Sequence, residues 1–207
     1  MEGRVKQIIP KVYKLYQRYG IKSVTMDDVA QHLGISKKTL YEFFADKEDL
    51  VKQVLLWDYD TKLDLFLEIE KKNLNAIEEL FEVYQMIKEL FKDYNPSVEY
   101  DVKKYYPALF SQFRDVKRSR MYELSMKNMN KGKKEGFYRS DLNASILARL
   151  HVFRVENIIE SELFSVEELT SISVFHEIFV YHLNGILSDS GRELLESNYQ
   201  NFSRPVS

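Results

Sequence analysis

Hydroxyl and lysine side chains between residues 36 and 47 are the groups in this sequence best suited to chemistry. Ser36, Lys37, Lys38 and Thr39 follow one another directly, and Lys47 comes soon after them. These side chains donate hydrogen bonds and positive charge, which suits phosphate oxygens and the acceptor atoms on base edges. Neither hydroxyl has a recognisable basic partner that would make it a nucleophile. The available chemistry is therefore recognition, and the surrounding elements must present these groups outward.

Two short helices joined by a glycine turn are expected to do so. Thr25, followed by Asp28 three residues later, resembles a capping box and predicts the start of a helix. Gly34 ends that helix, since glycine readily adopts the left-handed conformation that reverses the chain. Ser36 then caps a second helix over residues 37–44, whose positive N-terminus faces outward. This spacing is typical of a helix-turn-helix, whose second helix enters the major groove of DNA.

The same stretch resembles the DNA-binding head of the TetR family of bacterial transcription regulators. The residues that carry the family pattern are Tyr16, Gly20, Thr25, Val29-Ala30, Gly34-Ile35-Ser36, Thr39-Leu40-Tyr41, Phe44 and Lys47-Glu48. The match covers about residues 4–52, roughly a quarter of the chain. It implies an all-α fold of about nine or ten helices, with a helix-turn-helix DNA-binding domain over residues 1–50 and a helical effector-binding and dimerisation domain over 51–207. The function it implies is that of a repressor released from DNA by a small-molecule effector.

The resemblance also assigns roles to single residues of the head. It implies phosphate contacts for Thr25, Tyr41 and Lys47, the last at a helix N-terminus that favours anions. The resemblance also implies that the N-terminal end of the second helix faces the groove, with Ser36, Lys37, Lys38 and Thr39. Lys37 and Lys38 are the best candidates for base contacts because lysine donates to guanine O6 and N7. Taken singly, each residue has an ordinary alternative, since threonine and serine cap helices in any protein and surface lysines are usually solvated.

The hydrophobic spacing stays helical beyond residue 50, and the last two long helices are expected over about 144–160 and 166–187. One helix-turn-helix reads only half an operator, so a homodimer with its recognition helices one turn of DNA apart is expected. The resemblance implies a four-helix bundle across the two-fold axis, built from these two helices of each chain. The predicted interface residues are Leu150, Phe153, Phe175, Phe179 and Leu183. The alternative is that they belong only to the core of one chain.

The middle of the chain, about residues 63–134, is rich in aromatic side chains and is expected to enclose the effector. Tyrosine combines an apolar body with a polar tip, which suits a pocket for an apolar or aromatic molecule. The predicted pocket residues are Phe81, Tyr84, Phe110 and Phe113, although aromatic residues at helical spacing are more often core. A ligand that favours wrongly spaced heads would lower the affinity for DNA.

Composition excludes several other classes of protein. The chain has no cysteine, its four histidines lack metal-ligand spacing and it has no glycine-rich phosphate loop, so neither an enzyme nor a cofactor is expected. Residues 1–53 hold ten Lys and Arg against seven Asp and Glu, a mildly basic head on an acidic body. No apolar run has the length of a signal peptide or a membrane span, which predicts a cytoplasmic protein. The alternative function is an all-helical interaction module whose degenerate helix-turn-helix no longer binds DNA.

Overall fold

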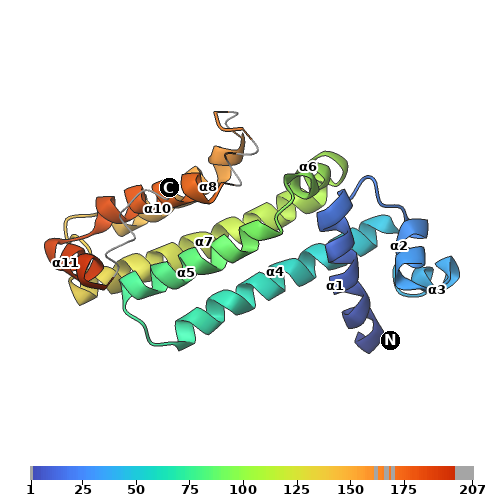
Figure 1. Ribbon diagram of the computed structural model, residues 1–207, viewed down its shortest axis with the longest axis horizontal. Helices are drawn as coiled ribbons and strands as arrows, with labels where there is room; N and C mark the ends of the chain where they lie inside the picture. Colours follow the sequence, from blue (N-terminus) through green and yellow to red (C-terminus); the bar gives the residue numbers. More distant parts are fainter. Residues whose placement is uncertain (1, 161–162, 166–167, 169–170, 199–207) are drawn as a thin grey trace. The chain divides into compact units, whose positions relative to one another are not determined.

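The computed structural model describes residues 2–160, 163–165, 168 and 171–198 (Figure 1). Within these ranges every regular element is a helix, apart from one isolated antiparallel bridge between Tyr138 and Leu187. The ten described helices are α1 Glu2–Tyr19, α2 Met26–Leu33, α3 Lys37–Tyr41, α4 Lys47–Lys71, α5 Ala76–Lys92, α6 Pro96–Tyr105, α7 Pro107–Glu135, α8 Ala144–Glu160, α10 Ile172–Ile186 and α11 Asp189–Asn198. The predicted all-α class is confirmed. None of these helices is both long and apolar enough to cross a membrane.

The chain forms two compact units. Unit 1 comprises Met1–Leu67 and Asp93–Arg114, and unit 2 comprises Glu68–Lys92 and Asp115–Ser207. This division differs from the predicted boundary at residue 50, because most of α4, all of α6 and the start of α7 belong with the helix-turn-helix. The physical reason is packing, since Val102 of α6 and Leu109 of α7 are buried in the same core as α1 to α4.

The core of unit 1 is built on the apolar face of α1. Val12 and Tyr16, one turn apart, are 0% and 1% exposed, as the hydrophobic spacing of this helix predicts. Three further side chains are completely buried in the same cluster: Leu40 of α3, Leu50 of α4, and Phe44 between these two helices. Each such side chain contributes about 1.5–3 kcal/mol by its removal from water. These contacts hold the two short helices of the turn, which would be too short to be stable alone.

The limits of α8 agree with the helix predicted over 144–160. α1 begins at Glu2 and continues through Pro10. A proline costs such a helix one hydrogen bond and some strain at the preceding turn, and the burial of α1 offsets this cost. α3 ends at Tyr41, earlier than predicted, because the next residues form a tighter turn in which the N–H of Phe43 donates to the carbonyl of Leu40. Of the helix predicted over 166–187, residues 166–167 and 169–170 lie outside the described ones.

Unit 2 has a separate core that draws on α5, α7, α10 and α11. Tyr138, which follows α7, is 1% exposed at its centre. Its hydroxyl lies 3.0 Å from the carbonyl oxygen of Ala76 and 2.9 Å from Oδ1 of Asn128. Burial holds the pKa of the Tyr138 hydroxyl well above its ordinary value, so this group remains a donor.

Candidate nucleic-acid interface

The first helix of the turn begins with the predicted capping box. The N–H of Asp28 donates to Oγ1 of Thr25 at 3.2 Å, and the N–H of Thr25 donates to Oδ2 of Asp28 at 2.8 Å. The Thr25 hydroxyl also donates to Oδ2 of Asp28, at 2.6 Å. These hydrogen bonds lower the pKa of the Asp28 carboxyl, which therefore stays charged. A phosphate contact by the Thr25 hydroxyl would have to replace its bond to Asp28.

The turn between α2 and α3 has the backbone that glycine permits. Gly34 has φ 66° and ψ 31°, the left-handed conformation predicted for it. The N–H of Ile35 donates to the carbonyl of Ala30 at 3.0 Å and closes the turn. The direction of α3 is therefore fixed by the end of α2.

The start of α3 is capped and exposed. Oγ of Ser36 accepts from the N–H of Thr39 at 3.0 Å, and the two hydroxyl oxygens lie 2.8 Å apart. The side chains of Lys37 and Lys38 are both exposed. Nζ of Lys37 forms an ion pair with Asp27 at 2.8 Å, which raises the pKa of Lys37. Lys38 has no ion-pair partner among the residues that the structure describes. Of the two lysines predicted to contact bases, Lys38 can therefore bind DNA without first breaking an ion pair.

Tyr41 and Leu40 divide α3 into an outer and an inner face. Leu40 is fully buried in the core of unit 1, whereas Tyr41 is 44% exposed. The hydroxyl and lysine groups lie on the solvent side with Tyr41, and the helix is attached through Leu40. Such an arrangement leaves one polar face of α3 available to a large anionic partner.

Lys47 is the first residue of α4 and is partly buried. Its Nζ donates to the carbonyl oxygen of Lys22 at 3.4 Å. Burial lowers the pKa of Lys47, while the nearby negative charges of Asp101 and Asp28 raise it. The α4 N-terminus is capped by Asp46, whose Oδ1 accepts from the Asp49 N–H at 2.8 Å. The structure therefore gives Lys47 a fixed place beside the start of α4.

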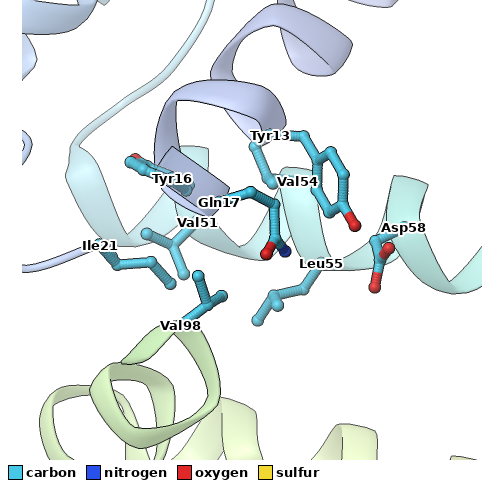
Figure 2. Close-up of a pocket in the computed structure, with 9 residues that line it drawn as sticks. All are labelled: Tyr13, Tyr16, Gln17, Ile21, Val51, Val54, Leu55, Asp58 and Val98. Carbon is cyan, nitrogen blue, oxygen red and sulfur yellow. The ribbon is translucent and has the colours of Figure 1, made fainter. Parts of the chain in front are cut away.

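The predicted effector residues belong to two different units. Phe81 and Tyr84 are buried in unit 2, and Phe110 and Phe113 are partly buried against the core of unit 1. A small pocket of about 30 Å³ lies within unit 1 (Figure 2). None of the predicted effector residues lines it; its lining comprises Tyr13, Tyr16, Gln17, Ile21, Val51, Val54, Leu55, Asp58 and Val98.

The predicted dimer residues also separate into two groups. Leu150 and Phe153 of α8 are 55% and 62% exposed. Phe175 of α10 stacks on Tyr84 of α5 with ring centres 5.1 Å apart, and Leu183 is 1% exposed. Phe179 packs with the same intrachain core. Leu183 is thus buried within its own chain, whereas Phe175 and Phe179 are only partly buried, and the interface itself stays a prediction.

Sequence reasoning missed Asp101, a buried carboxylate that contacts the head. Asp101 is 7% exposed, and its Oδ2 accepts from the N–H of Lys22 at 2.8 Å. The two residues are 79 positions apart, so no local pattern marks the pair.

In the described part of the chain, no group of three or more His, Cys, Asp or Glu residues is placed to hold a metal ion.

Known proteins share both the head and the whole-chain fold. Residues 13–54 match the sequence profile of the family described as bacterial regulatory proteins, tetR family. The chain is 24% identical over 186 residues to the uncharacterized HTH-type transcriptional regulator YvaF of Bacillus subtilis, a match that covers 89% of this chain and 96% of that protein.

Two solved structures illustrate the likeness in fold. A putative transcriptional regulator from Saccharomonospora viridis in complex with choline gives a TM-score of 0.71 at 22% identity, over 91% of this chain and 100% of that one. A gamma-butyrolactone receptor gives a TM-score of 0.63 at 16% identity, over 96% of this chain and 97% of that one. With its exposed, capped second helix, the head over residues 13–54 is that of the TetR family of helix-turn-helix transcriptional regulators.

Proposed function

We propose that the protein is a cytoplasmic, homodimeric repressor that a small-molecule effector releases from its operator. The observation that carries the proposal is the outer face of α3, where Ser36, Lys37 and Lys38 are exposed at a capped N-terminus. A repressor needs such a probe because its occupancy of DNA depends on base contacts in the groove. The buried Leu40 supports the same orientation, since it attaches the opposite face to the core.

The head residues take distinct roles in this proposal. Lys38 reads base edges, while Lys37 does so only by exchanging its partner Asp27 for DNA. Ser36 caps α3, and the hydroxyls of Ser36 and Thr39 face the groove with it. Tyr41, Lys47 and Thr25 contact phosphates and set the register of the head on the duplex.

A second copy of the chain is the proposed occupant of an apolar stripe on α8. Ile146, Leu150 and Phe153 recur every three or four residues and are all more than half exposed, so they lie along one helix face. Tyr181 of α10 is 78% exposed. Soluble monomers rarely leave such large apolar side chains together in water. A dimer would cover them and supply the second head that an operator requires.

The proposed effector is a small apolar or aromatic molecule. The relatives found with choline and named for gamma-butyrolactone support a small organic ligand for this fold. In unit 2, the rings of Phe81, Tyr84 and Phe179 pack together, with Tyr84 and Phe179 centres 4.8 Å apart. Aromatic surfaces of this kind bind apolar rings and organic cations.

A reporter experiment tests the repressor assignment. The region upstream of the protein's own gene is fused to a reporter in a heterologous host, with and without the full chain. Repression lowers the reporter output. Tyr41→Ala should restore the output because the proposed phosphate contact is lost. The protein level should stay equal, because Tyr41 is exposed and not needed for the core. Increased output would contradict a repressor. Unchanged output, together with no salt-dependent binding of the purified chain to that DNA, would favour the interaction module with a degenerate helix-turn-helix.

A further inference from the structure

We propose that Asp101 of α6 is a positioning residue for the phosphate-facing Lys47, acting through the connector between α1 and α2. The inference rests on the proposed phosphate contact of Lys47. Asp101 itself touches no DNA in this account. Its buried carboxylate holds the backbone against which the Lys47 ammonium is placed.

Lys22, in the connector, is held from both sides. Its N–H donates to Oδ2 of Asp101 at 2.8 Å, and its carbonyl oxygen accepts from Nζ of Lys47 at 3.4 Å. One peptide residue thus links α6 to the first residue of α4. Hydrogen bonds to a charged acceptor are about twice as strong as neutral ones, so the Asp101 end of this link is the firmer one.

The connector is shaped to admit the carboxylate. Gly20 has φ +77°, and a Cβ built there would lie 3.1 Å from Oδ2 of Asp101. A larger residue would therefore be strained by its backbone conformation and crowded by the acid. Because Asp101 is 7% exposed, its charge needs partners within the protein. The nearby positive charge of Lys47 and the Lys22 N–H supply them.

A second set of contacts fixes α6 to the end of α1. The Asn95 side-chain amide donates to the carbonyl of Gln17 at 2.8 Å, and the Asn95 N–H donates to Oε1 of Gln17 at 3.1 Å. Val98 of α6 points toward side chains of α1 and α4 in the pocket (Figure 2). α6 is thus held at its start, and Asp101 can act on the connector from a fixed support.

The sign of the effect separates positioning from a simple charge effect. Removing a negative charge from a DNA-binding unit should tighten its binding to DNA by reducing repulsion. If Asp101 positions Lys47, Asp101→Ala should instead weaken binding, because the connector and the ammonium lose their anchor. Glu99→Gln removes the same charge from the same helix and serves as the matched control, because Glu99 accepts its hydrogen bond from the hydroxyl of Tyr94 and not from Lys22.

The test uses the full chain and a fluorescent duplex of arbitrary sequence, about 30 base pairs long, at low salt, where sequence-independent binding is strong. Asp101→Ala should lower the affinity about tenfold, a size typical of coupled neighbours. In a Lys47→Ala background the same change should cost almost nothing. Asp101→Asn, whose amide oxygen still accepts from Lys22, should fall between Asp101→Ala and the wild type. Glu99→Gln should bind as tightly as the wild type or more tightly.

The outcomes distinguish the phosphate contact of Lys47 from the positioning role of Asp101. If Lys47→Ala alone leaves affinity unchanged, the phosphate role of Lys47 is wrong and this inference falls with it. If Lys47→Ala weakens binding but Asp101→Ala costs the same in both backgrounds, or binds as well as the wild type, only the positioning role is overturned. If Asp101→Ala does not melt cooperatively, Asp101→Asn decides: binding no weaker than the wild type rejects the inference.

Discussion

Replacing Lys47 with alanine should weaken binding to every DNA sequence to the same extent. Nζ of Lys47 is held by the Lys22 carbonyl at the start of α4, a position suited to a phosphate and not to a base edge. Each phosphate neutralised contributes about −0.9 to the slope of log affinity against log salt, so the slope should become shallower by about 0.9 per protomer and about 1.8 per dimer. The loss of one partly screened, charge-assisted hydrogen bond costs about 1–2 kcal/mol per protomer.

The assay is fluorescence anisotropy over a salt series, on an operator selected from random duplexes and on an arbitrary duplex. Lys38→Ala is the matched control, because it removes the same charge from an exposed position on α3. Lys38→Ala should reduce the magnitude of the binding free energy on the operator by about 1–3 kcal/mol. The loss should depend on base identity, so the order of affinities among other sequences should change. An unchanged salt slope in Lys47→Ala, or a loss confined to one sequence, would refute the assignment.

Three further outcomes are expected. Burial lowers the pKa of His151 to about 4 and the pKa of His182 to about 3, whereas both are about 6.5 in the unfolded chain. The stability present above pH 6.5 is therefore lost as the pH falls toward 4, by up to about 1.4 kcal/mol per pH unit for each imidazole. Urea unfolding at pH 7 and pH 5 measures this loss, and equal free energies of unfolding at the two pH values would count against it. Tyr138→Phe should cost about 1–2 kcal/mol in thermal unfolding because Oδ1 of Asn128 loses its donor, and an unchanged melting temperature would be inconsistent with that bond. Phe153→Glu, at 62% exposure, should yield a folded monomer in sedimentation, whereas a persistent dimer would move the interface elsewhere.

The head could be predicted closely because its signals are local. Thr25 and Asp28 cap a helix within four residues, and Gly34 takes the conformation that its lack of a side chain allows. Ser36 caps α3 in the same way. Such motifs depend on neighbours in sequence, so spacing alone identifies them.

The contacts that join distant segments could not be predicted. Asp101 looks like an ordinary helical acid until α6 packs against the connector near Lys22. The same limit affected the apolar residues of α8 and α10, since periodicity shows that a face is apolar but not what covers it. Phe153 proved exposed, whereas Leu183 was buried within its own chain. The division into units likewise depended on α6 joining the head core through Val102.

Dimethyl sulfate protection of guanine N7 on the selected operator tests most directly whether α3 enters the major groove. For the wild-type dimer we expect two protected clusters one helical turn apart, about 34 Å, and loss of protection at particular guanines in Lys38→Ala. Tight, salt-dependent binding with every guanine N7 still reactive, or with protection that Lys38→Ala leaves intact, would contradict the account.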